Sequence, residues 1–256
     1  MDQQQFWLAY QPKLDLTTDR ITDAEVLLRW THPERGEISP VEFIPAAERS
    51  LRIGRLTDYV VARALVSARS LLALGDLKLA VNVSVPALAN PLFAAPLLHK
   101  CGQQGVPPER IMVEITGSVL MAADDTQVEV TLAQLRNFGF GLSIDDFGTG
   151  FSSLEYVRRI PTHEMKIDQS FVKRLTSSPA DRVVVESVLR MAHDFDRTVV
   201  AEGVENQETL ELLRELGCDV ICPHLSGPST IIVWTLREKM DGQEASHAGG
   251  DYREVA

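Results

Sequence analysis

Cysteine is scarce in this chain, and long apolar runs are absent. Its 256 residues include only Cys101, Cys218 and Cys222, an odd number without CxxC spacing, which favours free thiols in a reducing compartment. No run approaches the roughly 18 apolar residues of a membrane-spanning helix, and the first residues do not begin a basic and then apolar leader. The sequence as given therefore predicts a cytoplasmic location and no membrane contact.

Basic residues are in the minority. The chain has 25 Lys and Arg against 36 Asp and Glu, for a formal net charge of −11. Non-specific nucleic-acid affinity comes mainly from clustered basic side chains, so this balance argues against DNA or RNA as a partner while leaving room for a specific phosphate pocket. At this length about three quarters of the unfolded chain's surface can be buried, so the core requires neither disulfides nor a structural metal.

Short β-branched segments alternate with longer amphipathic ones. The predicted strands are residues 6–16, 21–30, 77–84, 111–116, 141–147, 163–168, 197–204 and 218–225. Helical patterns lie near residues 87–104, 126–138, 180–195 and 207–216. Only four residues, 17–20, join the first two strands, which predicts an antiparallel hairpin. With no glycine-rich dinucleotide turn after the first strand, the pattern favours an α/β fold of the (β/α)₈ barrel type.

The chain contains no Pro- or Ser-rich linker, so residues 1–240 are expected to form one barrel domain. Residues 241–256 are rich in Gly, Ala, Glu and Gln and have almost nothing apolar to bury. They are expected to form a disordered tail.

Polar residues recur where the predicted strands end. They are Glu25, Arg29, Asn82, Glu114, Asp145, Asp146, Lys166, Asp168, Glu202 and Glu205. In a barrel the carboxyl ends of the strands converge on one mouth, so these side chains are expected to become neighbours. An isolated carboxylate in an apolar strand is costly to bury without a cation or several donors. The alternative is a scatter of unrelated salt bridges.

The charge at this predicted mouth indicates its partner. Five carboxylates outnumber Lys166 and Arg29, so divalent cations are expected there. An all-oxygen donor set, with the amide of Asn82, suits magnesium or manganese better than zinc. The adjacent Asp145 and Asp146 can each reach a different ion, and paired ions are typical of displacement at phosphorus. The residues therefore predict metal-assisted phosphoester hydrolysis.

Seven ordered motifs resemble those of the EAL-type cyclic-di-GMP phosphodiesterases. They are Tyr10-Gln11-Pro12, Glu25-Val26-Leu27-Leu28-Arg29, Asn82-Val83-Ser84, Glu114-Ile115-Thr116, the loop from Asp145 to Leu154, Lys166-Ile167-Asp168 and Ala201-Glu202-Gly203-Val204-Glu205. The resemblance implies a modified TIM barrel with an antiparallel first strand, often dimeric. It also implies opening of cyclic-di-GMP to linear pGpG by a water held between two Mg²⁺ or Mn²⁺ ions. Because the chain begins almost directly at its first predicted strand, we expect it to be a domain of a longer parent protein with sensory or signalling domains.

The resemblance also implies roles for individual residues. The metal ligands would be Glu25, Asn82, Glu114, Asp145, Asp146 and Glu202. Lys166 and Glu202 would be catalytic, with Lys166 orienting or helping to deprotonate the water. Ligand binding would involve Gln11, Arg29, Asp168 and Glu205, with Arg29 on a phosphate and Glu205 in support.

Three positions depart from the family pattern. Val26 replaces the family's alanine, a change expected to be mild because its side chain alternates away from Glu25. Gly117 stands where the family has a glutamate that tethers the loop after Asp146. Cys222 replaces a glutamine in the last strand and is expected to be a packed thiol, since a thiol is a weak hydrogen-bonding group. Loss of residues that support the metal ligands can lower metal affinity or activity about 10 to 100-fold.

Three functions remain open at this stage, together with a purely structural role for Lys166. The chain could be a slow or conditionally active phosphodiesterase, or a non-catalytic cyclic-di-GMP receptor that needs no metals. Lys166 could instead form a Schiff base in a metal-free lyase, although five nearby acids would raise its pKa and disfavour the free amine. Lys166 could also be a buried counter-ion to Asp168, two residues away on the same strand face.

Overall fold

The strands close into a barrel. The computed structural model describes residues 5–50, 52–72, 77–116, 126–148 and 154–223. Among these residues the strand order is β1-β9-β8-β7-β6-β5-β4-β2-β3, and β1 also pairs with β2, which joins the two ends of the sheet. Eight strands therefore form the barrel wall, while the short β3 extends β2 as a hairpin. The predicted α/β barrel is confirmed.

The elements follow the chain in this order. The strands are β1 Phe6–Asp15, β2 Arg20–His32, β3 Gly36–Ile38, β4 Lys78–Asn82, β5 Ile111–Thr116, β6 Gly141–Phe147, β7 Glu164–Ile167, β8 Thr198–Val204 and β9 Val220–Pro223. The helices are α1 Pro40–Arg49, α2 Ile53–Leu72, α3 Val85–Leu88, α4 Ala94–Gln104, α6 Thr126–Asn137, α7 Leu154–Arg159, α8 Gln169–Val172, α9 Pro179–Asp194 and α10 Gln207–Glu215, with a 3₁₀ turn at Pro108–Arg110.

The first strand runs against its neighbours. β1 pairs antiparallel with both β2 and β9, whereas the pairs from β2–β4 through β8–β9 are parallel. The predicted hairpin is confirmed, and its turn is held by Asp15, whose Oδ1 accepts hydrogen bonds from the backbone N–H groups of Thr17 and Thr18. The register places Gln11 opposite Glu25.

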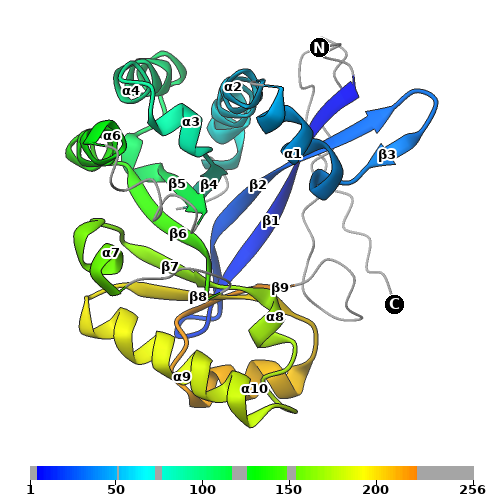
Figure 1. The fold of residues 1–256 in the computed structure, drawn as a ribbon, viewed down its shortest axis with the longest axis vertical. Helices are drawn as coiled ribbons and strands as arrows, with labels where there is room; N and C mark the ends of the chain where they lie inside the picture. The colour runs from blue at the N-terminus through cyan, green and yellow to red at the C-terminus, as the bar shows by residue number, and fades with distance from the viewer. Residues whose placement is uncertain (1–4, 51, 73–76, 117–125, 149–153, 224–256) are drawn as a thin grey trace.

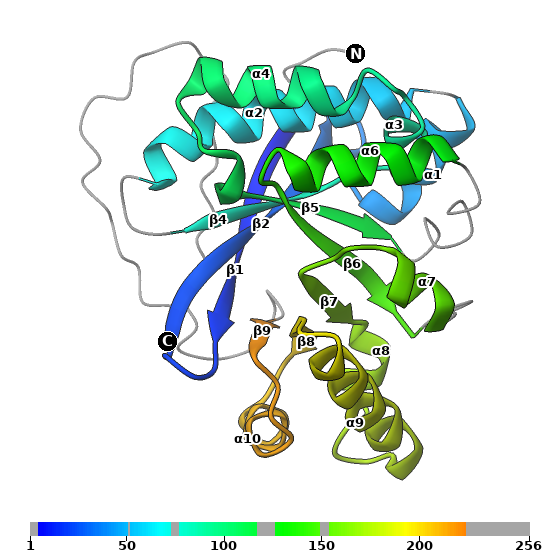
Figure 2. The ribbon, with the colours of Figure 1, turned by 90° about the vertical axis from the view of Figure 1, so that its left-hand side faces the viewer.

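Helices cover the outside of the barrel. α2, α4 and α6 gather on one side (Figure 1), and α9 and α10 lie on another, as the turned view also shows (Figure 2). Strand residues such as Leu79, Ile115 and Leu142 are fully buried in the apolar core. Because side chains alternate along a strand, the residues next to these in each strand face the barrel interior. Those interior positions carry much of the polar chemistry.

One predicted helix is divided in two. Residues 87–104 were expected to form a continuous helical pattern, but α3 ends at Leu88 and α4 begins at Ala94. Asn90 accepts a hydrogen bond from the backbone of Leu92 through its side chain, a local alternative to helical pairing. Pro91 disfavours a helical conformation for the residue before it and has no N–H to donate. The expectation of one helix is therefore wrong.

Several of the predictions fall wholly or partly outside the described residues. The expected last strand, 218–225, appears as β9, Val220–Pro223, and the predicted tail 241–256 lies outside the described residues. Gly117 and most of the loop after Gly148 also lie outside them. Across the part of the chain that is described, no helix combines the length and apolar character needed to cross a bilayer.

Candidate active site

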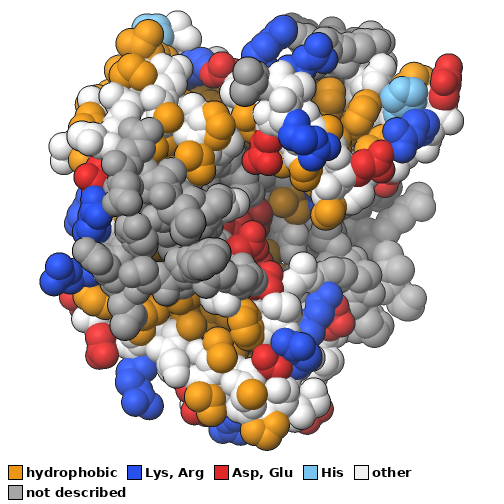
Figure 3. All heavy atoms as spheres, viewed as in Figure 1, with side chains coloured by type: hydrophobic (Ala, Val, Ile, Leu, Met, Phe, Trp, Pro, Cys, Tyr) orange, Lys and Arg blue, Asp and Glu red, His pale blue; other side chains and the backbone are white. Residues whose placement is uncertain are grey.

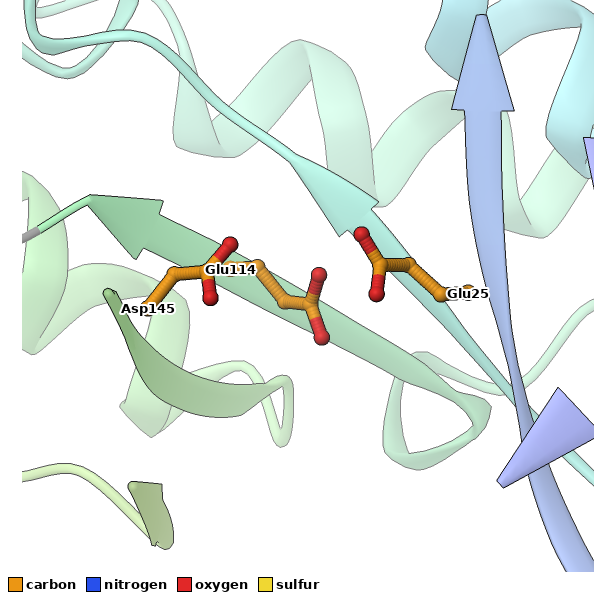
Figure 4. Close-up of side chains that lie close together, drawn as sticks. All are labelled: Glu25, Glu114 and Asp145. Atoms are coloured by element: carbon orange, nitrogen blue, oxygen red, sulfur yellow. The ribbon is translucent and has the colours of Figure 1, made fainter. Parts of the chain in front are cut away.

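Acidic side chains from distant parts of the sequence meet inside the barrel. Glu25 lies on β2, Glu114 on β5 and Asp145 on β6, and their carboxylates converge on one space (Figure 4). All three residues are buried. The space-filling view shows acidic side chains in a hollow near the middle of one face (Figure 3). The carboxyl ends of the strands thus bring the predicted acids together.

Lys166 is the centre of this cluster. Its Nζ lies 2.7 Å from Glu202, 3.0 Å from Glu25, 3.1 Å from Asp145 and 3.3 Å from Glu114. The lysine side chain is fully buried. One ammonium group therefore stands among four carboxylates contributed by four different strands.

The side chain of Asp168 pairs with Ser170, and not with Lys166 as the counter-ion hypothesis required. β7 ends at Ile167, and Asp168 caps α8 by accepting a hydrogen bond from the backbone N–H of Ser170 at 3.0 Å. Its side chain also contacts the hydroxyl of Ser170. The interpretation of Lys166 as a counter-ion to Asp168 is therefore wrong, because the acids around Lys166 come from other strands.

The consecutive acids Asp145 and Asp146 sit at a break in the strand pattern. Neighbouring residues in a regular strand point to opposite faces. Here the β6–β7 register shifts between Ile144 and Phe147, and Asp146 adopts a left-handed conformation with φ of 55°. The backbone N–H of Asp146 donates to Oδ1 of Asp145 at 2.9 Å. This bulge lets two adjacent carboxylates serve the same mouth.

Two groups of acids have oxygens close enough to share an ion. Glu25, Glu114 and Asp145 form one group, and Asp145, Asp146 and Glu202 form the other, with ligand atoms within 4.8 Å of one another in each. Asn82 lies beside the first group, where its Nδ2 donates to Oε1 of Glu25 at 3.0 Å. Carboxylate and amide oxygens suit hard divalent cations, so the donor set fits magnesium or manganese.

For two of the acids, burial and repulsion from neighbouring carboxylates outweigh the attraction of Lys166. Burial, with repulsion from neighbouring acids, raises the pKa of Glu202 to about 8 and that of Asp145 to about 6, despite the attraction of Lys166. Burial would also favour the neutral amine of Lys166, but Glu114, Glu25 and Asp145 outweigh it and raise the Lys166 pKa. A charged lysine argues against the Schiff-base alternative.

A second buried lysine, which sequence reasoning missed, lies beside the cluster. Lys13 on β1 contacts Oε1 of Glu114 at 2.8 Å and Oε1 of Glu164 at 2.9 Å. The hydroxyl of Ser143 donates to the same Glu164 oxygen at 2.8 Å. Lys13, Glu114 and Ser143 are fully buried, and Glu164 nearly so. A lysine two positions from Gln11 shares its strand face, which was the available signal.

A cavity of about 330 Å³ adjoins the acids. Arg29, Asn82, Asp145 and Asp146 line its polar part, and the remaining wall is largely apolar. That remaining wall contains Val26, Leu27, Leu28, Pro40, Ile44, Glu48, Ile53, Leu56, Thr57, Val60, Val83, Ser84, Val85, Pro86 and Thr116. A pocket lined mostly by apolar residues, with an arginine and acids among them, is typical of a small-molecule site.

Gln11 and Glu205 lie outside the acid cluster. The side-chain amide of Gln11 donates to the carbonyl oxygen of Pro223 at 2.6 Å, linking β1 to β9. Glu205, just beyond β8, forms an ion pair with Lys173 at 3.0 Å. Both residues hold neighbouring elements together in this structure.

Cys222 is packed, as expected. It is buried with Val200 and Val220 in a small apolar cluster, and burial raises the pKa of its thiol well above the ordinary value. Val26, the other departure that the structure describes, is buried in the main core.

Gly203, next to Glu202, occupies a position that excludes a side chain. Its φ is +68°, and a Cβ there would lie 2.6 Å from Cβ of Gln169 on α8. Gly203→Ala should therefore lose roughly 1–2 kcal/mol of unfolding free energy from the left-handed backbone and about 1–3 kcal/mol more from the overlap. Urea unfolding would measure the loss.

Gly36→Ala is the matched control for this substitution. Gly36 has a similar φ of +72°, but nothing lies within 4 Å of its added Cβ, so only the backbone cost applies. Equal losses in the two variants would show that α8 yields to the new methyl group at little cost.

The fold and the site together define a closed α/β barrel with an acidic mouth able to hold a metal ion. The chain belongs to the EAL domain family, whose model matches residues 1–222. It is 38% identical over 218 residues to the cyclic di-GMP phosphodiesterase PA2567 of Pseudomonas aeruginosa, covering 83% of this chain and 36% of that protein. It is 37% identical over 223 residues to the cyclic di-GMP phosphodiesterase NbdA of the same organism, covering 86% and 28%.

Solved structures give the same relationship. The barrel matches that of the PaMucR phosphodiesterase in its c-di-GMP complex with a TM-score of 0.81 and 35% identity, covering 86% of this chain and 89% of that one. The chain spans only about a third of the length of the curated relatives PA2567 and NbdA.

Proposed function

We propose that this chain hydrolyses cyclic-di-GMP to linear pGpG with two divalent cations, Mg²⁺ or Mn²⁺. The observation that carries the proposal is the excess of carboxylates around the buried Lys166 at the edge of a cavity. Five acids with one lysine leave four negative charges when all are ionised, a surplus that two divalent ions would balance. The relatives named as cyclic di-GMP phosphodiesterases support the substrate.

The proposed ligand set uses the predicted oxygen donors. These residues are Glu25, Asn82, Glu114, Asp145, Asp146 and Glu202. Bound divalent ions would polarise the phosphate and make water a stronger nucleophile. Asp145 belongs to both acidic groups and is therefore placed to serve both ions. Glu202 contributes a carboxylate that is partly accessible, with 19% of its side chain exposed.

Lys166 is proposed as the catalytic cation. Because the surrounding acids raise its pKa, it keeps its proton near neutral pH. A fixed ammonium group would stabilise the negative charge that develops on the phosphate and would orient the attacking water. The charged state favours this role over that of a base.

Arg29 is proposed to bind a phosphate of the substrate. It shares a strand face with Glu25, so the two side chains reach the same mouth. Arg29 lines the cavity together with Asp145 and Asp146, while apolar residues are available for a guanine base. Gln11, Asp168 and Glu205 are proposed as further ligand-binding residues. Burial, and after it the nearby charge of Asp168, raises the pKa of Asp146.

The setting of the domain is also a proposal. We infer a homodimer from the family resemblance, and further sensory or signalling domains from the short span of this chain on its relatives. The three cysteines are free and buried, which supports a cytoplasmic location.

A turnover assay tests the function. Purified protein with Mg²⁺ or Mn²⁺ should convert cyclic-di-GMP to pGpG, as followed by chromatography, and Glu25→Ala should abolish conversion because one acidic group loses a ligand. Glu186→Ala, on the exposed side of α9, is the matched control and should retain activity. Wild-type product no greater than that of Glu25→Ala would defeat the catalytic proposal.

A non-catalytic cyclic-di-GMP receptor is the second candidate. Cys222 favours it, because a thiol packed against Val200 and Val220 cannot supply the amide of the family's glutamine. Calorimetry in excess chelator separates the two. Undiminished cyclic-di-GMP affinity without metal, combined with no turnover when metal is added, would favour the receptor.

A further inference from the structure

Lys13 forms a second charged layer in the barrel. Its side chain is fully buried, and its Nζ bridges Glu114 and Glu164. Ser143 donates to Glu164 from the next strand, and Asp23 stands opposite Lys13 in the β1–β2 register. The Oε1 atoms of Glu114 and Glu164 are therefore both held by short contacts to Lys13 across the barrel.

Glu114 is shared by the two lysines. Its Oε1 accepts a hydrogen bond from Lys13 at 2.8 Å, and its Oε2 accepts one from Lys166 at 3.3 Å. Lys166 in turn contacts Glu25 and Asp145. One end of the Glu114 carboxylate therefore points toward Lys13, while the other belongs to the cluster at the mouth.

This arrangement resists rotation of the carboxylate. Burying an ammonium ion is costly, and its removal would leave the acids that it contacts without their partner. Burial alone would raise the pKa of Glu114, yet Lys13 and Lys166 outweigh that cost and lower it to about 2. The orientation of the Glu114 carboxylate thus depends on its hydrogen bonds to both lysines.

We propose that Lys13 is a positioning residue for the divalent-cation site, holding Oε1 of Glu114 so that Oε2 stays on Lys166, which also contacts Glu25 and Asp145. This inference rests on the proposed metal-dependent function. Lys13 acts through Glu114 and touches neither the substrate nor the reacting atoms. Glu164 and Ser143 complete the role by holding the ammonium group of Lys13 in place.

Charge and positioning make opposite predictions for two variants. Lys13→Met with Glu164→Gln removes one positive and one negative charge, so the net charge equals that of the wild type. Glu164→Gln alone leaves Lys13 on Glu114 but makes the interior one unit more positive. Coulomb repulsion alone would make the single variant the weaker binder of a divalent cation. Positioning by Lys13 makes the double variant the weaker one.

A titration with Mn²⁺ decides which variant binds the ion more weakly. The electron paramagnetic resonance signal of the free ion reports binding, so the test does not depend on catalytic activity. We expect Lys13→Met/Glu164→Gln to bind Mn²⁺ about 10 to 100-fold more weakly than wild type, and Glu164→Gln to stay closer to wild type. A double variant that binds as tightly as Glu164→Gln, or more tightly, overturns the role of Lys13. Circular dichroism checks that each variant is folded.

A substitute variant and the wild-type titration complete the test. If the methionine variant does not fold, Lys13→Gln with Glu164→Gln replaces it, because glutamine keeps a polar group but is one bond too short to reach Oε1 in the same way. The same order of affinities is expected. Wild-type protein that binds no Mn²⁺ overturns both the metal site and this inference, whereas wild-type binding with the reverse order overturns this inference alone.

Discussion

Lys166→Met is expected to lower the unfolding free energy of the metal-free protein by about 3–5 kcal/mol, because it removes the cation from a buried cluster of acids. Glu25, Glu114, Asp145 and Glu202 all lie within 3.3 Å of the Lys166 ammonium. Without it, the acids must take up protons or repel one another in a site of low polarity. Urea unfolding in excess chelator measures the loss.

Divalent metal should reverse much of this loss. The same titration with saturating Mg²⁺ should stabilise Lys166→Met more than wild type, since the ions replace the missing positive charge. Turnover should nevertheless remain low, because the fixed ammonium group is gone.

Lys173→Met is the matched control for this substitution. Lys173 also pairs with a glutamate, Glu205, but the two side chains are 38% and 43% exposed. An exposed pair contributes less than about 1 kcal/mol, so this variant should unfold almost as wild type does. A metal-free Lys166→Met protein as stable as Lys173→Met would contradict the view that the acids depend on Lys166.

The barrel was predictable because its information is local. The segments that became β5 and β6 are short, β-branched and separated by amphipathic stretches, and their predicted bounds, 111–116 and 141–147, agree with the structure. The four-residue connection at 17–20 left only a hairpin for β1 and β2. Acids such as Glu114 and Asp145 stood out because carboxylates are costly within apolar strands.

The second charged layer could not be predicted in the same way. Lys13 meets Glu114 and Glu164 across the barrel, at sequence separations of 101 and 151 residues. Such pairs depend on barrel closure and on the register of β1, which the periodicity of a single strand does not contain. The bulge at Asp146 was hidden for a related reason, since the left-handed conformation of one residue leaves no periodic signal.

Helices on the outside of the barrel were also harder to predict from the sequence. The interval between the second and third predicted strands was assigned no helix bounds, yet it contains α1 and the 20-residue α2. Pro45 lies within α1, where proline normally argues against a helix. Packing of buried residues such as Phe43 and Ala47 outweighs that local preference.

Metal affinity is expected to rise steeply with pH. In the metal-free protein burial raises the pKa of Glu202 to about 8 and that of Asp145 to about 6, so both carboxyls hold protons more tightly than ordinary acids do. A ligand oxygen must lose its proton to bind a divalent ion, and each proton released gives about a tenfold gain per pH unit. Between about pH 6 and pH 8, release from Glu202 alone should raise Mg²⁺ affinity on the order of 100-fold.

Stability of the metal-free protein should change in the opposite direction. A carboxyl whose folded pKa is raised favours the folded state at low pH, and this contribution is lost as pH rises from the unfolded value of about 4.5 through the folded value of about 8 for Glu202. Unfolding in chelator should therefore become easier across this range, while saturating Mg²⁺ should remove the trend. Calorimetry in buffers of different ionisation enthalpy would count the protons released. Glu202→Gln should release fewer protons and show a flatter affinity profile, so an unchanged steep profile in that variant would mean that another group titrates.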